Sequence, residues 1–141
     1  MSVRSLFTRF FGIGLILLAG ARMTAAAPEP EAVWAKVTLE TRDHAPLLER
    51  EAKLPRKQTR SAVVITVLTL QPDLVGMISA VTASYDNMEN PAESKVTVTE
   101  RGILDDDLIA IRHVISLAKN SNGEWRAVGY RRGELRRSHL H

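Results

Sequence analysis

The chain has 141 residues, with 19 Lys and Arg against 16 Asp and Glu, which gives a formal net charge of +3. Cysteine is absent, so disulfides and a lipid linked to cysteine are both excluded. This length is enough for one domain with a single hydrophobic core, but not for two.

The first 26 residues are predicted to form a cleavable signal peptide. Residues 1–9 are basic and carry no acidic residue, residues 10–21 are apolar, and small residues follow at 25–27. An uncleaved anchor is the alternative, but the apolar run is shorter than the ~20 residues needed to cross a bilayer. Because Pro28 disfavours cleavage directly before it, we expect cleavage after Ala26. The mature protein is then periplasmic or secreted, as in bacterial export.

Removing this segment changes the charge balance. Arg4, Arg9 and Arg22 lie within it, which leaves 16 basic against 16 acidic residues. The high sequence pI of about 9.6 therefore belongs largely to the discarded segment. We expect no nucleic-acid partner, because the mature chain lacks the net basic charge that such binding requires.

Residues 27–132 are predicted to form one α+β domain. Apolar and polar residues alternate over 33–41, which is typical of a half-buried strand. Pro46 is placed to open a short helix that Pro55 would end. Residues 61–70 are almost continuously apolar and rich in Val and Ile, which favours a strand covered on both faces.

One amphipathic helix is expected over 73–85. Its apolar residues fall at spacings of three and four, which gives one apolar stripe. Gly76 and Thr82 lower the helix propensity, so packing against the sheet has to compensate. The stripe consists of Leu74, Met77, Ile78, Val81 and Tyr85.

The last part of the domain predicts an antiparallel three-strand meander over 94–101, 107–118 and 124–132. The middle segment alternates, with Ile and Leu residues and His113 on one face. The predicted fold is therefore α+β, an antiparallel sheet packed by the helix at 73–85.

The three acids at 105–107 occupy the first link of the meander. A turn is the favoured interpretation, because aspartate side chains bond nearby backbone amides. A cation site is the alternative, although the alternating ligand spacing of a calcium loop is missing.

His113 and Trp125 are the two candidate site residues inside the meander. A lone histidine in an apolar row is usually a packed or hydrogen-bonded core group, and proton transfer would need a positioned partner. Trp125 opens the last strand, where large aromatic residues usually cover the core. Stacking of a ligand on Trp125 is the alternative.

Four short segments of the C-terminal third resemble a group of small exported bacterial proteins of unknown function. Those proteins pair a hairpin of the type LLDDS-V-R-A-x-R-Y-R with a G-x-W strand. Many of them end in a tail that bears cysteine, and this chain does not. The resemblance implies export and a helix-plus-meander layout, and no catalytic residues. The matching segments are 96–99, 102–106, 111–112 and 123–125.

Residues 133–141 are predicted to form a flexible basic tail. Basic residues near an anionic lipid surface contribute about 1 kcal/mol each, so this end of the chain could attach to such a surface. A solvated, disordered end is the alternative. His139 and His141 make a poor metal site on a mobile tail. The basic residues considered are Arg126, Arg131, Arg132, Arg136 and Arg137.

The sequence favours a non-enzymatic binding or accessory domain of the bacterial envelope. The Gly-x-Ser-x-Gly elbow, the phosphate loop, the His-Glu-x-x-His zinc helix and a cysteine nucleophile are all missing. A small envelope enzyme, such as a hydrolase without a recognisable motif, is the alternative. The expected partner is another envelope protein or an anionic envelope surface. We expect no catalytic residue, no cofactor, no metal and no stable membrane span after processing.

Overall fold

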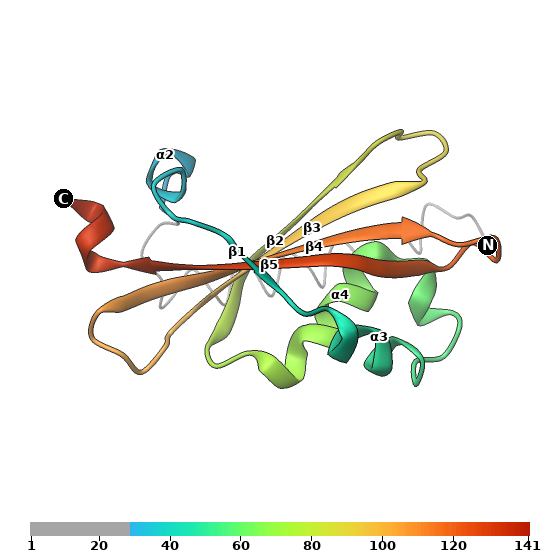
Figure 1. Cartoon of the computed structure of the whole chain (residues 1–141), viewed down its shortest axis with the longest axis horizontal. Helices are drawn as coiled ribbons and strands as arrows, with labels where there is room; N and C mark the ends of the chain where they lie inside the picture. The colour runs from blue at the N-terminus through green and yellow to red at the C-terminus, as the bar shows by residue number, and fades with distance from the viewer. Residues whose placement is uncertain (1–28) are drawn as a thin grey trace, which may run out of the picture.

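The computed structural model describes residues 29–141, so the predicted signal peptide lies outside the described residues. The chain forms a five-stranded antiparallel sheet in the order β1-β5-β4-β3-β2, with helices on both faces (Figure 1). The predicted α+β class with a C-terminal meander is confirmed. The strands are β1 (Glu40–Arg42), β2 (Met77–Tyr85), β3 (Glu93–Arg101), β4 (Leu108–Lys119) and β5 (Trp125–Arg136). The helices are α2 (Glu31–Trp34), α3 (Ala45–Glu51), α4 (Ala62–Leu70) and the 3₁₀ turns η1 (Gln58–Arg60), η2 (Gln71–Asp73) and η3 (Arg137–Leu140).

The segment 73–85 is a strand and not the predicted amphipathic helix. Strand β2 pairs with β3 from Met77 opposite Arg101 to Tyr85 opposite Ser94. This pairing satisfies the backbone of a segment that is rich in β-branched and small residues, which suit a pleated surface better than a helix. The helical spacing of its apolar residues is therefore coincidental.

The segment 61–70 is a helix and not the predicted buried strand. Its N-terminus is capped by Ser61, whose Oγ accepts a hydrogen bond from the backbone N–H of Val64 at 3.3 Å. Thr66 and Thr69 donate their hydroxyls to carbonyls one turn earlier, at 2.7 Å each. The helix thus buries both threonines without losing hydrogen bonds, and a buried helix can be apolar on every side.

The segment 33–41 is also not the predicted strand. It contains the single turn of α2, a connector over 35–39 that starts with a turn, and only the start of the short β1. Val33, Trp34 and Val37 pack together on the sheet, which a helical turn allows and an alternating strand would not. The short helix that Pro46 was expected to open is confirmed as α3, which ends before Pro55.

Strand β5 extends four residues beyond the predicted end at 132, so the predicted start of a flexible tail at 133 is wrong. The connector over 35–39 crosses β5 at Gly133. A Cβ atom there would lie 2.6 Å from Leu39 Cδ2 and 2.9 Å from Val37 Cγ1. Glycine at this position lets the two backbones approach, and η3 follows the strand.

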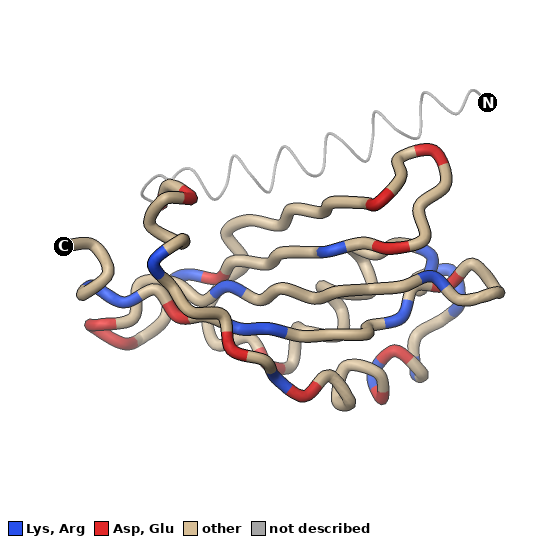
Figure 2. Tube along the Cα trace, turned by 45° about the horizontal axis from the view of Figure 1, so that its top comes forward, with Lys and Arg blue, Asp and Glu red and all other residues tan. Residues whose placement is uncertain are grey.

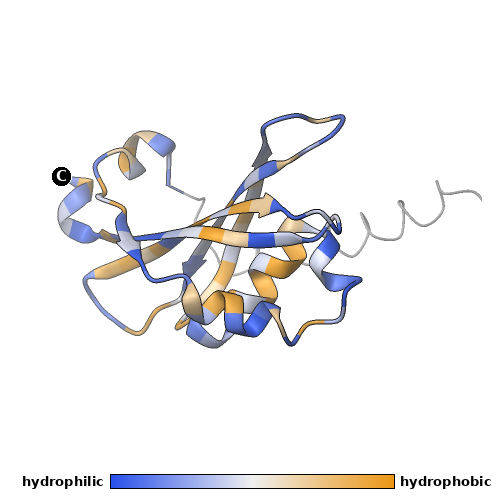
Figure 3. Ribbon diagram, turned by 45° about the vertical axis from the view of Figure 1, so that its right-hand side comes forward, coloured by the Kyte–Doolittle hydropathy of each residue, from blue (hydrophilic) through white to orange (hydrophobic). Residues whose placement is uncertain are grey.

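The main core lies between the sheet and the helices α3 and α4, where the hydrophobic colour gathers in Figure 3. It joins Leu47 and Ile65 of the helices to Val96, Ile115 and Leu117 of the strands. A smaller cluster on the other face joins α2 to β4 and β5. Among residues 29–141, no helix combines the length and hydrophobicity that crossing a membrane requires.

Candidate binding pocket on the open face of the sheet

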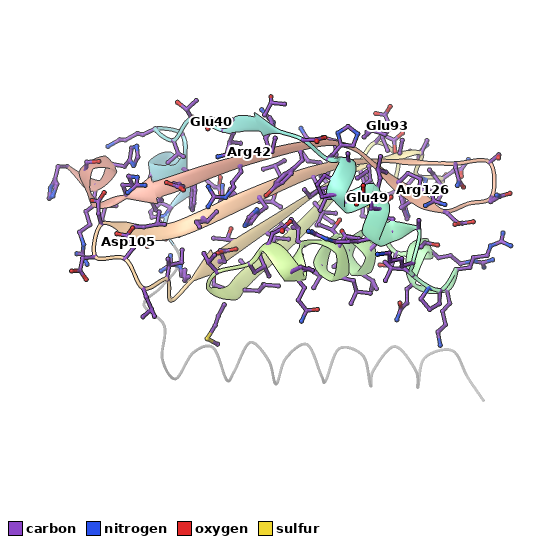
Figure 4. All side chains as sticks on the ribbon, turned by 60° about the horizontal axis from the view of Figure 1, so that its bottom comes forward. Glu40, Arg42, Glu49, Glu93, Asp105 and Arg126 are labelled. Atoms are coloured by element: carbon purple, nitrogen blue, oxygen red, sulfur yellow. The ribbon has the colours of Figure 1, made fainter. Side chains whose placement is uncertain are left out.

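The two faces of the sheet are covered unequally. Helices α3 and α4 lie along one face, which Figure 4 shows below the strands. Within residues 29–141 the opposite face is covered at one end, by α2 and the connector, and we call it the open face. Its residues on the three strands β2, β3 and β4 are Ala80, Thr82, Ser84, Lys95, Thr97, Thr99, Arg101, Arg112, Val114 and Ser116.

A pocket of about 370 Å³ lies on the open face beneath the N-terminus of the described chain. This volume falls within the usual range of small-ligand sites. The floor is made of small and hydroxyl side chains, two arginines and one tryptophan form its wall, and two glutamates close it from above. The lining residues are Ser79, Ala80, Thr82, Thr97, Thr99, Arg101, Arg112, Trp34, Glu29 and Glu31.

Residues 29–34, which we call the N-terminal strap, cover this pocket, so we call it the strap pocket. The strap consists of an extended start and the single turn of α2. Trp34 anchors it, because this ring is 6% exposed and packs against Ala110 and Leu135. Figure 2 shows the strap and connector lying over one end of the strands.

Arg112 binds the strap in two ways. Its two terminal nitrogens donate to the two carboxylate oxygens of Glu31, at 2.8 and 3.0 Å. The guanidinium also stacks over the Trp34 ring, 4.2 Å from its centroid. The hydrogen bonds from Arg112 lower the pKa of Glu31, whose side chain stays largely in solvent.

Arg101 makes the second link to the strap, through an ion pair with Glu29. Both side chains are only 16% exposed, and burial lowers the pKa of Arg101. A half-buried guanidinium loses solvation, which a bound carboxylate restores in part. The two arginines therefore form a carboxylate-binding pair on neighbouring strands.

His113 belongs to a buried polar network on the helix-covered face. Its Nε2 lies 2.8 Å from Glu100 Oε2, and its Nδ1 lies 2.8 Å from the Tyr130 hydroxyl. The other carboxylate oxygen of Glu100 accepts the backbone N–H groups of Val75 and Gly76, at 3.1 Å each. Sequence reasoning identified His113 but neither of its side-chain partners, which lie on other strands.

The network is consistent with a neutral imidazole. Burial lowers the pKa of His113, and the hydrogen bond to Glu100 opposes this effect without reversing it. The carboxylate can only accept, so Nε2 carries the proton and Nδ1 accepts the Tyr130 O–H. His113 is 1% exposed and Glu100 is fully buried, so a substrate could approach this chain of groups only from Tyr130, which is 9% exposed.

Glu51 is a second buried carboxylate that sequence reasoning missed. Its Oε1 accepts the backbone N–H of Ala127 at 2.9 Å, while its Oε2 has no hydrogen-bond partner among residues 29–141. Burial raises the pKa of Glu51. The charged form is therefore disfavoured here relative to water.

Trp125 lies in the main core, 3% exposed, with its ring centroid 6.0 Å from that of Tyr85. The amine of Lys119 lies over the Trp125 ring at 5.0 Å. In the first link of the meander, Asp105 Oδ1 accepts the backbone N–H groups of Asp107 and Leu108. The predicted turn at 105–107 is thereby confirmed.

The five basic residues considered for surface binding are spread along β5 and the first residue of η3, and they do not form one patch. Ten residues of extended strand separate Arg126 from Arg136, or about 34 Å, and Figure 4 places Arg126 at the opposite end of the sheet from Asp105. Figure 2 shows basic residues at both ends of this strand.

Most of these basic side chains also have partners. Arg126 pairs with Glu124 at 3.3 Å, and Arg132 and Arg136 share Glu134 at 2.8 and 2.6 Å. Two further contacts join β5 and η3 to the first link of the meander: Arg136 pairs with Asp107 at 3.0 Å, and Arg137 donates to the backbone carbonyl of Asp106. Arg131 is exposed.

No group of three His, Asp or Glu side chains suited to a metal ion occurs within residues 29–141. His139 instead stabilises the N-terminus of η3, where its Nδ1 accepts a hydrogen bond from the backbone N–H of Arg136 at 3.0 Å.

Sequence reasoning did not find the strap pocket, although one signal was present. Arg112 directly precedes His113 in the predicted middle strand of the meander, so the two side chains must point to opposite faces. The pattern thus placed a charged side chain on the face opposite the apolar row. Its carboxylate partner lies 81 residues earlier in the chain, and nothing local indicates that pairing.

A scan of the chain against protein-family models gives no match, and searches of curated proteins and of solved structures give none either.

Proposed function

We propose that this protein is an exported envelope protein that acts as a non-enzymatic binding domain, with its partner docking on the open face at the strap pocket. The observation that carries the proposal is the pocket itself. It combines two half-buried arginines and a tryptophan with a floor of small hydroxyl side chains. Arginine and tryptophan are the residues most enriched in binding hot spots.

Export is part of this proposal and is supported by the order of basic, apolar and small segments at the N-terminus. Cleavage after Ala26 leaves a mature chain that begins at Ala27, two residues before Glu29. Intact mass of the protein recovered from the envelope tests this directly. A mass that includes Met1 would contradict export with cleavage.

The open face has better support as a docking surface than the basic residues of β5. Four of those five side chains are engaged by acidic groups or a carbonyl of the same chain, which reduces the charge left for an anionic surface. Such a surface would also meet basic residues dispersed along about 34 Å of strand. Attachment of β5 to an anionic surface is therefore the weaker form of the binding hypothesis.

Affinity capture from solubilised envelope tests the role of the open face. Thr97→Trp fills the pocket floor from the centre of β3, and Ser121→Trp adds the same side chain to the exposed turn between β4 and β5. We expect the wild type and Ser121→Trp to capture the same partner after crosslinking, and Thr97→Trp to lose it. Equal capture by the two variants would exclude docking at the strap pocket.

One observation favours the alternative, a small envelope enzyme. The chain of Glu100, His113 and Tyr130 positions a hydroxyl against an imidazole, as in sites that activate a nucleophile. Its burial makes it a better structural network than a reaction centre. Hydrolysis of a simple aryl ester by the purified protein, abolished in Tyr130→Phe, would support the enzyme instead.

A further inference from the structure

The strap pocket contains a pair of arginines whose present ligands belong to the same chain. Arg112 lies opposite Thr99 of β3, and Arg101 is two residues after Thr99 on that strand. Because side chains alternate along a strand, both arginines lie on the same face. The strap delivers Glu29 and Glu31 to these two guanidiniums, with Pro30 between them. The two arginines thus already bind two carboxylates of their own chain at this spacing.

We propose that the strap pocket is a binding site for acidic peptide segments, and that Glu29 and Glu31 occupy it in cis until such a segment displaces them. This inference rests on the proposed function and adds the ligand chemistry and its competitor. The planar guanidinium matches a carboxylate bidentately, as Arg112 already does with Glu31. The hydroxyls of Thr82, Thr97 and Thr99 supply hydrogen-bonding groups for a peptide backbone along the floor.

The strap is suited to exchange because its two ends differ in how firmly they are held. Trp34 is buried against the sheet and fixes the C-terminal end. Glu31 is 82% exposed, and Pro30, which precedes the helix, makes no side-chain cap. The ion pair of Glu31 is weak because its carboxylate is exposed, so Glu31 can leave first. Glu29, whose side chain is 16% exposed, then leaves Arg101 while Trp34 stays in place.

A peptide ligand is favoured over other anions by the bound segment itself. The occupant in cis is a Glu-Pro-Glu stretch whose two glutamates line the pocket, rather than a single charged group. Proline restricts the backbone, which lowers the entropy lost when both glutamates bind. Free phosphate is a single charged group, so it would not reproduce two carboxylates joined by a peptide backbone.

Competition in cis sets the size of the expected effect. The two ion pairs of the strap, each taken at the strength of a surface pair, reduce the affinity for an external ligand by roughly 2- to 30-fold. Replacing both glutamates with glutamine keeps the shape of the strap and removes that competition. The same change leaves Arg101 and Arg112 ready for an added carboxylate.

The test uses protein exported with its own leader and purified after processing. The probe is acetyl-Pro-Glu-Pro-Glu-Ala-amide, which repeats residues 28–32, titrated by calorimetry at low salt. We expect the Glu29→Gln/Glu31→Gln variant to bind this probe roughly 2- to 30-fold more tightly than the wild type. A probe with glutamine in place of both glutamates should lose binding, as should the variant that also carries Arg112→Gln.

Several outcomes would overturn the proposal. Equal affinity of the wild type and the double variant excludes competition by the strap. If the double variant unfolds at the same urea concentration as the wild type but does not bind the probe, a carboxylate-binding site in the pocket is excluded. Tighter binding of inorganic phosphate than of the probe excludes an acidic peptide as the ligand. If the double variant unfolds early, Glu31→Gln alone repeats the test, because that side chain is largely exposed.

The proposed function can fail separately. If the probe does not bind but Thr97→Trp still abolishes partner capture, the open face docks a partner of other chemistry. If Thr97→Trp captures normally, docking on the open face is excluded whether or not the probe binds.

Discussion

Replacing Tyr130 with Phe tests the buried network around His113 with the smallest available change. The substitution removes one hydroxyl and leaves the aromatic ring, which stacks with His113 at a centroid distance of 5.9 Å. It also removes the donor that His113 Nδ1 accepts at 2.8 Å. Because the imidazole is 1% exposed, water cannot replace that donor without opening the core.

An acceptor left buried and unpaired costs about 1–3 kcal/mol. For a domain of this size, with a urea dependence of about 1.5 kcal/mol per molar, the midpoint of unfolding should fall by about 0.7–2 M. Urea unfolding followed by tryptophan fluorescence measures the shift, with an unchanged slope as evidence that the native state stays compact.

Tyr85→Phe is the matched control. Tyr85 is partly exposed, so water can replace what its hydroxyl loses, and its ring packs beside Trp125. We expect a change within about 0.5 kcal/mol for this variant, as for substitutions away from buried polar groups. If Tyr130→Phe costs no more than Tyr85→Phe, the argument for a satisfied, neutral His113 fails.

Three further predictions concern pH, backbone approach and a buried charge. The folded-state pKa of His113 is lowered, so its neutral form contributes its full stability above about pH 6.5. As the pH falls from there toward the folded-state pKa, the free energy of unfolding should decrease by up to about 1.4 kcal/mol per pH unit. This pH dependence should be smaller in His113→Gln. Gly133→Ala should cost about 1–3 kcal/mol by clashing with the connector, whereas Gly129→Ala, whose nearest neighbour would be at 3.6 Å, should be nearly neutral in the same urea assay. Glu51→Gln keeps an oxygen for the Ala127 N–H and removes a carboxyl group whose pKa is raised by burial, so at pH 7 the variant should unfold at a higher urea concentration than the wild type. A gain in the urea midpoint over the wild type that is equal at pH 4 and pH 7 would contradict this reason.

The meander could be predicted from the sequence because its signals are local. Alternation of apolar residues continues through β4, and the turns at 105–107 and 120–123 carry residues that favour turns. Pro46 likewise marked the short helix α3. Such patterns need no information from distant parts of the chain.

The exchange of helix and strand between 61–70 and 73–85 has a physical cause. A continuous apolar run suits a buried helix as well as a buried strand, and periodicity alone does not separate them. Ser61 as a helix cap and the two threonines that bond back along α4 were the local signs of a helix. Residues 77–85 form a strand because they pair with β3, and no pattern within a single sequence indicates that pairing.

The candidate site was hidden from sequence reasoning because its parts come from distant segments. Glu29 and Glu31 precede the sheet, while Arg101 and Arg112 lie on its central strands. The basic residues predicted to bind a surface, in contrast, lie within twelve positions of the sequence, but the extended strand spaces them apart. Acidic side chains of the same chain pair with several of them. Proximity in sequence was therefore a poor guide to a binding surface in this sheet.

The most direct test of the strap pocket is the NMR signal of the arginine side-chain Nε–H groups during titration with the acidic peptide. In the Glu29→Gln/Glu31→Gln variant we predict saturable shifts for Arg101 and Arg112, and none for Arg56, which lies on an exposed loop beside Glu124. Unmoved signals of Arg101 and Arg112, or equal shifts for all three arginines, would contradict the account.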